Sequence, residues 1–397
     1  MNVSFFIAKR LRFKGNVAMI SIAVSFLVMI IAVAVSTGFR SEIRSGLSAI
    51  TGDIRLVPPG MNVMDSDLPV DSSPAYLPHV QDMKGVEAVV PVAYKAGIVK
   101  NAGNIHGVLL KGIPDWAASS YVGPFKDTLA LPVSIPSRFA EISGLGPGDR
   151  MLTYFVGEEM KVRQFNVTAV HETLIEADDN IVVYADLDDI RRLNGWDQTK
   201  ASCIEIILDS DHKSESQILE KQNEAAYLIY EYGSEDEETV IATSSVMTYP
   251  QLFDWLNLID FNVLFILILM TIVAGFNMIS GLLIMLFENI STIGLLKSLG
   301  MTDKSIAKVF LSSSAVLTLK GMALGNILAA VFCLIQGTTH LLRLNPENYF
   351  VSFVPVELDF GMILLADLSA FIMIMILLLI PCLFISKVDP ADTVRVK

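Results

Sequence analysis

Cysteine is scarce in this chain, and its placement excludes a polar domain that is stabilised by internal disulfide bonds. Three cysteines occur among 397 residues, and Cys333 and Cys382 fall inside long apolar runs. Cys203 is the only one in the polar part of the sequence, so no disulfide can form within that part. This region of more than 200 residues is long enough to be stabilised by a hydrophobic core of its own.

Motifs for nucleotide, metal and nucleophile chemistry are also missing. The sequence contains no G-x-x-x-x-G-K-[ST], so it cannot bind ATP in the P-loop manner. Its five histidines are scattered, without an H-E-x-x-H pattern or a cysteine pair nearby. There is no G-x-S-x-G elbow. We therefore expect no catalytic residue, no metal and no cofactor bound by this chain.

Charge is sparse as well, and this places the chain in a membrane. Charged residues make up 18% of the sequence and apolar residues 52%, with a mean hydropathy of +0.53. The apolar residues concentrate in four blocks at 17–37, 262–287, 309–335 and 362–385. Each block can cross a hydrocarbon core about 30 Å thick at 1.5 Å per residue. We predict four transmembrane helices.

Basic residues set the predicted orientation, since those close to a span stay in the cytoplasm. Three clusters agree on cytoplasmic termini: Lys9, Arg10, Arg12 and Lys14; Lys297, Lys304 and Lys308; and Lys387, Arg395 and Lys397. The first block is long for a cleaved signal peptide and lacks a small-x-small site at its end, so an uncleaved anchor is favoured.

Residues 39–255 read as a separate domain outside the membrane. They carry 33 acidic and 17 basic side chains, which repels nucleic acid. A helical stalk at 39–51 is followed by predicted strands at 86–92, 94–99, 105–110, 151–156, 163–170, 181–184 and 201–208, with helices at 135–142, 187–193 and 214–227. The predicted fold class is an α-helical membrane protein with four transmembrane helices and a large α+β periplasmic domain inserted between the first two.

A short polar stretch at 288–300 joins the second and third blocks. Ile290, Ile293, Leu296 and Leu299 recur at three- and four-residue intervals, which predicts an amphipathic helix. Gly300 ends it, and Thr302 or Asp303 can cap the next helix. We interpret this stretch as a cytoplasmic coupling helix on which a soluble partner acts. Its predicted docking residues are Ile293, Leu295, Leu296, Lys297, Leu299 and Gly300.

Four polar or small residues inside the apolar blocks require explanation. Gly321 and Gly325 form a G-x-x-x-G that lets a neighbouring helix approach closely, although glycine is also simply common in spans. Lys320 and Asp367 are ionisable groups that face protein, water or an interface. Measured from the middles of their spans, they differ in depth by roughly 15 Å, so we expect no direct pair.

The segment from Phe253 to Phe310 resembles the permease core of the FtsX/MacB superfamily, and so does the tail KVDPADTVRVK. Asn277, Ser280, Lys297, Leu299, Gly300 and 389–395 carry this match. In the amino-terminal half, GFRSEIRSGLSAITGDIRLV, VVPVAYKAGIVKNAGNIHGVLLKGI and GLGPGDRM resemble lipoprotein-releasing permeases of the LolC/LolE type. The resemblance covers nearly the whole chain. The stretch from Thr153 to Lys161 is shorter than the hook with which LolC-like members recruit a carrier.

This resemblance implies a division into residues 1–38 with the first span, 39–255 as a MacB-like periplasmic domain, and 256–397 as an FtsX-like core. It implies a bacterial inner-membrane permease that dimerises with a second copy or a sister permease. A cytoplasmic ABC ATPase dimer would bind ATP and Mg, and a lipoprotein would be handed to a periplasmic carrier. The alternatives are an FtsX-like signal transmitter and a MacB-like efflux permease.

Extraction of a lipid anchor requires an apolar surface that is open sideways to the bilayer. The first and second spans and their stalks join the membrane to the outer domain, so they are the predicted walls of this surface. We place the lipid-anchor cavity at Phe39 and Ile43.

Overall fold

The computed structural model describes residues 16–61, 68–101, 103–116, 119, 121, 131–155, 160–171, 181–209, 212–235, 237–345, 349 and 351–387. The chain divides into two compact units. The helical unit contains Met1–Ser41, Trp255–Arg343 and Phe353–Lys397, and the sheet unit contains Glu42–Asp254 and Leu344–Ser352. The basic residues at 9–14 and the tail at 388–397 lie outside the described residues.

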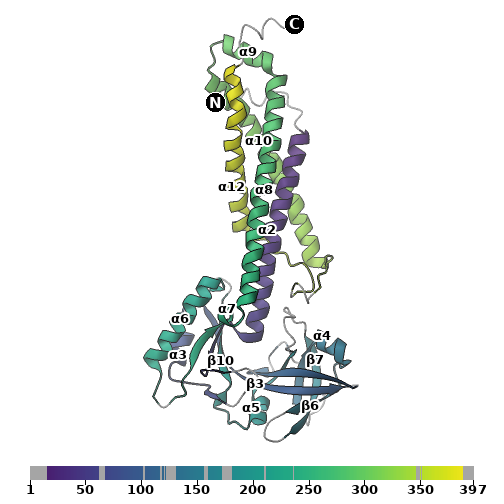
Figure 1. Cartoon of the computed structure of the whole chain (residues 1–397), viewed down its shortest axis with the longest axis vertical. Coiled ribbons are helices and arrows are strands. Elements are labelled where there is room, and N and C mark those ends of the chain that lie inside the picture. The colour runs from purple at the N-terminus through teal and green to yellow at the C-terminus, as the bar shows by residue number, and fades with distance from the viewer. Residues whose placement is uncertain are drawn as a thin grey trace. The chain divides into compact units, whose positions relative to one another are not determined.

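The helical unit is built from long apolar helices that lie side by side (Figure 1). Its elements are α2 (Asn16–Thr51), α8 (Pro250–Glu288), α9 (Ile290–Ser298), α10 (Asp303–Thr339), α12 (Phe360–Leu377), α13 (Leu379–Cys382) and the 3-10 helix η3 (Leu383–Lys387). Four candidate spans among the described residues are long and apolar enough to cross a membrane, and each contains one of the four predicted blocks. Their inward-facing side chains form one hydrophobic cluster that includes Phe26, Met278, Phe310 and Ile374.

Two helices contain residues of both units. α2 includes the predicted stalk and ends at Thr51, where Gly52 adopts a φ of +67° that ends the helix without a side-chain clash. α8 begins at Pro250, before the unit boundary at Trp255. The stalk is thus the continuation of the first candidate span.

The sheet unit contains eleven strands among the described residues, of which β3 is the longest. They are β1 (Ile54–Val57), β2 (Val70–Asp71), β3 (Val86–Asn101), β4 (Asn104–Ile113), β5 (Leu131–Pro136), β6 (Arg150–Phe155), β7 (Lys161–His171), β8 (Ile181–Asp186), β9 (Lys200–Ala201), β10 (Cys203–Leu208) and β11 (Ile241–Ser244). Among the described residues, nine of them follow the order β11-β1-β10-β3-β4-β8-β5-β7-β6, and β2 pairs with β9.

The two strands predicted at 86–92 and 94–99 are in fact one strand, β3. Its first half pairs with β10 and its second half pairs with β4. Near its end, Ile98 and Val99 also pair with β6, which closes β3, β4, β8, β5, β7 and β6 into a ring. Phe139, Phe165 and Val183 belong to the buried cluster that this ring surrounds. The hairpin of β3 and β4 was correctly predicted.

The short helices of the sheet unit are α3 (Leu77–Gln81), α4 (Ser137–Ser143), α5 (Leu187–Asn194), α6 (Glu215–Tyr232) and α7 (Ser245–Thr248). Ser214 and Gln217 form a reciprocal capping box at the start of α6. The helix predicted at 135–142 begins two residues later, since Ile135 belongs to β5. β5 and β11 were not predicted at all, because both are short and lack a clear alternation.

Candidate functional site

The stretch predicted to be a coupling helix forms the short helix α9, which connects α8 to α10 at one end of the helical unit (Figure 1). Gly300 has a φ of +86°, a conformation that favours glycine, and it lies just beyond the helix. The hydroxyl of Thr302 accepts a hydrogen bond from the amide of Ser305 and so caps α10. Lys297 forms an ion pair of 2.9 Å with Asp303, which ties α9 to the first turn of α10. These contacts hold α9 at a fixed angle to its neighbours.

The residues predicted to dock a partner are not all exposed on α9. Ile293 is buried and Leu296 packs against the hydrophobic cluster of the helical unit. Leu295 and Leu299 are instead 56% and 75% exposed, and they lie one turn apart on the same face. Leu295 and Leu299 are therefore the exposed apolar residues of the predicted docking stretch, whereas Ile293 and Leu296 pack inward and Lys297 pairs with Asp303. The apolar pattern of the sequence did not show which of these residues face the bundle.

Gly321 and Gly325 lie where α10 meets α2. A Cβ atom added at Gly321 would come within 2.8 Å of the Ile22 side chain, and one at Gly325 within 2.5 Å of the Ala23 carbonyl oxygen. Real Cβ atoms do not approach other atoms this closely, so a larger residue would push the two helices apart. The two glycines thus set the α2–α10 distance.

The two ionisable residues of the spans have different surroundings. Lys320 is exposed on the surface of α10. Asp367 is buried on α12 and accepts a hydrogen bond from Asn326 of α10. Because this bond aligns Asp367 with Asn326, only six residues of α10, or about 9 Å, separate the level of Lys320 from that of Asp367. The separation is smaller than the predicted 15 Å because hydropathy fixes the middle of a span only loosely.

The residues proposed to contact a lipid anchor are packed in the protein interior. Phe39 is 7% exposed and its ring meets Trp255 edge to face, with 5.7 Å between centroids. Ile43 is fully buried. In this conformation neither side chain lines an open cavity, which corrects the prediction. Burial was missed because the stalk contains both charged and apolar residues and gives no clear helical face.

α2 and α8 are held together close to Phe39 by polar contacts. Ser36 donates a hydrogen bond of 2.7 Å to Asp260, and Arg40 forms an ion pair with the same carboxylate. Both contacts lie within the helical unit, one to two turns from the Phe39–Trp255 pair. We refer to Ser36, Phe39, Arg40, Trp255 and Asp260 as the α2–α8 latch. Separation of the two helices here requires breaking all three contacts.

The carboxyl end of α2 is anchored in the sheet unit by a buried lysine. Lys111 of β4 donates from Nζ to the carbonyl oxygens of Ala49 and Ile50, at 3.2 and 2.8 Å. The same ammonium pairs with Glu205 of β10 at 2.8 Å, and both side chains are almost fully buried. Tyr94 donates its hydroxyl hydrogen to the other oxygen of Glu205. Burial, reinforced by the negative charge of Glu205, raises the pKa of the Tyr94 phenol well above its ordinary value.

We call Lys111, Glu205 and Tyr94, together with the last turn of α2, the helix joint. The last four carbonyl groups of a helix have no partner inside the helix, and an ammonium group is well suited to bind them. Sequence reasoning missed the joint because Lys111 and Glu205 lie on separate strands and neither belongs to a motif. A lysine at a position that should be buried in β4 was the only available signal.

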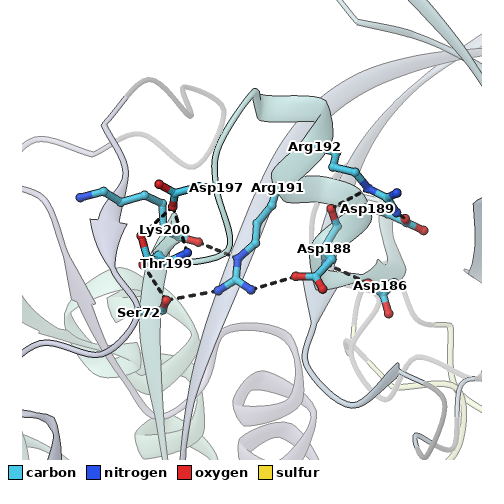
Figure 2. A network of polar contacts seen from close by, with 9 residues as sticks. All are labelled: Ser72, Asp186, Asp188, Asp189, Arg191, Arg192, Asp197, Thr199 and Lys200. Carbon is cyan, nitrogen blue, oxygen red and sulfur yellow. Dashed lines mark hydrogen bonds and ion pairs between the residues drawn. The ribbon is translucent and has the colours of Figure 1, made fainter.

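A second buried cation organises the loops beside α5, as Figure 2 shows. Arg191 donates from Nε to the carbonyl oxygen of Lys200 at 2.7 Å and from a terminal nitrogen to Asp188 at 3.0 Å. It also contacts the hydroxyl of Ser72, which is 119 residues away in the sequence. This network joins α5, β9 and the segment after β2. Among the described residues, no group of three or more His, Cys, Asp or Glu side chains is placed to hold a metal ion.

A serine and a histidine also meet in the sheet unit. Ser134 lies 2.9 Å from His171 Nδ1, and Tyr184 packs against the imidazole ring. Ser134 is fully buried, and His171 Nε2 is buried without a hydrogen-bond partner among the described residues. Burial lowers the pKa of His171 to about 4, so the ring is neutral at pH 7. Ser134 and His171 thus form a buried polar contact within the sheet unit.

Comparisons with known proteins match both halves of the chain. Residues 264–390 match the FtsX-like permease C-terminal family. The lipoprotein-releasing system transmembrane protein LolC of Neisseria meningitidis serogroup B is 23% identical over 422 residues, which cover 98% of this chain and 96% of the relative. LolC of Xylella fastidiosa strain 9a5c is 21% identical over 409 residues, covering 96% of this chain and 94% of the relative.

Solved structures resemble about half of the chain. The extracellular domain of the noncanonic ABC-type transporter YknZ from Gram-positive bacteria is 16% identical with a TM-score of 0.30, covering 48% of this chain and 99% of that domain. The periplasmic region of MacB from Actinobacillus actinomycetemcomitans is 13% identical with a TM-score of 0.32, covering 52% of this chain and 95% of that region.

Proposed function

We propose that this chain is an ABC transporter permease of the FtsX-like family that releases lipoproteins from the inner membrane. Residues 264–390 match that family, and LolC aligns with nearly the whole chain. The energy would come from ATP hydrolysis, with ATP and Mg bound by a partner ATPase dimer. The chain itself would be a non-catalytic subunit that pairs with a second copy or a sister permease.

One observation carries this proposal: the similarity to LolC extends through the sheet unit as well as the permease core. The FtsX-like model matches only 264–390, a region that signal transmitters and efflux permeases would share. The LolC relatives align over 96–98% of this chain, including the residues between the first two candidate spans. This favours lipoprotein release over a function that requires only the core.

The geometry supports a mechanical route from the ATPase to the substrate. Leu295 and Leu299 provide an exposed apolar face on α9 for the ATPase, and the Lys297–Asp303 ion pair links α9 to α10. α10 packs closely on α2 at its two glycines. Movement of α10 would therefore be passed to α2, and opening of the α2–α8 latch would admit a lipid anchor.

Extraction of an anchor demands a large input of energy. Each buried methylene contributes about 0.8 kcal/mol to membrane affinity, so an acyl chain cannot leave without a receiving apolar surface. The latch offers such a surface once open, because it would expose Phe39 and Trp255. Handing the lipoprotein to a periplasmic carrier would follow, with both termini of the permease in the cytoplasm.

The test is the location of lipoproteins after depletion of this permease in its host. We expect outer-membrane lipoproteins to accumulate in the inner membrane and to return to the outer membrane when the wild-type chain is supplied. Normal lipoprotein sorting in the absence of this chain and any sister permease would overturn the proposal. A defect confined to cell-wall hydrolysis would then indicate a signal transmitter, and a defect confined to drug resistance an efflux permease.

A second experiment tests the docking face. Leu295→Asp and Leu299→Asp place a charge on an exposed apolar face, where docking would bury it at a cost of several kcal/mol. We expect both variants to fold and to lose association with the ATPase in pull-down assays. Ser291→Asp, at an exposed position earlier on α9, is the matched control. Unchanged ATPase binding by both leucine variants would show that α9 is not the docking element.

A further inference from the structure

A carboxyl group and an amide meet inside the helical unit, away from solvent. Asn326 of α10 donates from Nδ2 to Oδ2 of Asp367 on α12. Asp367 is 6% exposed, so its carboxyl group is almost completely enclosed by protein. Two more oxygen atoms, Asp367 Oδ1 and Asn326 Oδ1, are buried without a hydrogen-bond partner among the described residues.

An ionised carboxylate does not explain this arrangement. A carboxylate can only accept hydrogen bonds, and so can an amide oxygen, so the two unpartnered atoms cannot satisfy each other. A buried charge without a cation is also costly, most of all within an apolar helix bundle.

Within the described parts of the neighbouring helices, no residue supplies the missing cation. α12 contains no other charged residue from Phe360 to Leu377. On α10, Lys320 lies about 9 Å along the helix from Asn326 and is exposed, while Asp303, Lys304 and Lys308 belong to the first two turns. The charged residues of α2 and α8 lie toward the helix ends: Arg40, Glu42 and Arg44 on α2, and Asp254, Asp260 and Glu288 on α8.

We propose that Asp367 carries a proton and pairs with Asn326 through two hydrogen bonds. The protonated Oδ1 donates to Asn326 Oδ1, while Asn326 Nδ2 continues to donate to Asp367 Oδ2. A single proton thereby satisfies both unpartnered oxygens and removes the buried charge. The result is a neutral acid–amide clamp between α10 and α12.

The clamp lies next to the glycine contact of α10. Gly325 packs against α2, and the adjacent Asn326 binds α12, so one turn of α10 is fastened to two helices at the same level. This predicts that the site binds a proton tightly and serves to fix the helix register. Neither the clamp nor its test depends on the proposed release of lipoproteins.

Substitutions that keep or remove the second hydrogen bond test the clamp in the purified full-length chain in lipid nanodiscs. Asp367→Asn replaces the protonated carboxyl with an amide that can make both bonds, so we expect an unchanged melting temperature. Asp367→Leu leaves Asn326 unpaired, and we expect a melting temperature several degrees lower or a failure to fold. The double variant Asn326→Leu with Asp367→Leu removes both polar groups, and we expect it to recover most of the loss.

Infrared spectroscopy tests the proton directly. The difference spectrum between the wild-type chain and Asp367→Asn at pH 7 should contain the carbonyl stretching band of one protonated carboxyl group. Absence of this band, or a loss of stability in Asp367→Asn equal to that in Asp367→Leu, would overturn the proposal. Stability that depends on added Na⁺ or K⁺ in the wild type but not in Asp367→Asn would also overturn it, because it would assign the site to a metal cation.

Discussion

Removal of the ammonium group from the helix joint is the most informative perturbation of the sheet unit. In Lys111→Met the side chain keeps a similar length but no longer donates to Ala49 and Ile50 or pairs with Glu205. The Glu205 carboxylate then stays buried, with the Tyr94 hydroxyl on one of its oxygens. The last turn of α2 loses its donor at the same time.

The expected cost follows from the burial of both partners. Removing one member of a buried ion pair destabilises a protein by about 3–5 kcal/mol, because the remaining charge is left uncompensated. Lys111 and Glu205 are 2% and 3% exposed, so solvent screening does not reduce this figure. We expect local opening of the joint to become roughly 10²–10⁴ times more frequent, at 1.4 kcal/mol for each factor of ten.

Hydrogen exchange followed by mass spectrometry on the full-length chain measures this opening. Amides at the end of α2 and in β4 and β10 should exchange faster in Lys111→Met, while those of α10 and α12 should not change. Lys100→Met is the matched control, since Lys100 is exposed on the same hairpin and its loss should change stability by less than about 0.5 kcal/mol.

A double variant separates the two parts of the cost. Lys111→Met with Glu205→Gln removes the unpaired charge, so it should regain more than half of the lost protection. Wild-type exchange rates in Lys111→Met would refute the reasoning, and so would a double variant as labile as the single one. The first result would mean that the joint carries no stability, and the second that the buried charge is not its source.

Three further predictions concern the orientation, pH dependence and thiol chemistry of the chain. After replacement of the native cysteines, Ser216→Cys should react with an impermeant thiol reagent in intact spheroplasts and Ser298→Cys should not; the opposite pattern would reverse the topology. His171 has a folded-state pKa of about 4 against an ordinary value near 6.5, so the unfolded chain binds a proton first as the pH falls. The neutral His171 therefore contributes to the free energy of unfolding above pH 6.5, and about 2 kcal/mol of this contribution is lost by pH 5. Urea unfolding monitored by near-UV circular dichroism should show this fall in the free energy of unfolding for the wild type and not for His171→Gln. Burial raises the pKa of Cys203 to about 12, so in the native wild-type chain this thiol should resist alkylation until urea unfolds the sheet unit, and rapid native alkylation would show that the site opens.

The sequence was sufficient for features that depend on local periodicity. Each predicted apolar block lies within one long helix, and the end of the stalk at Gly52 and the turn after α9 at Gly300 were predicted close to their observed positions. Runs of apolar residues and terminal glycines act over a few residues, so the local sequence was enough. The capped start of α10 at Thr302 was predicted for the same reason.

Features that depend on long-range contacts were missed or misplaced. Hydropathy could not show that Leu296 faces the bundle while Leu295 does not, because both are leucines on a short helix with apolar residues around it. The break predicted within β3 was wrong for a related reason. The strand changes partners from β10 to β4 at this point, and the local sequence does not encode partner choice.

The two units solve the problem of a buried ionisable group in different ways. In the sheet unit, strands from distant parts of the sequence bring together opposite charges, so Lys111 and Glu205 can both remain ionised with their hydrogen bonds satisfied. In the helical unit, the described residues of the spans include no cation at the level of Asp367, and we propose that this group retains a proton. An apolar span can present an amide such as Asn326 at far lower cost than a lysine. A neutral clamp therefore fits a helix bundle in lipid, whereas a charged joint suits a sheet whose own strands supply the counter-charge.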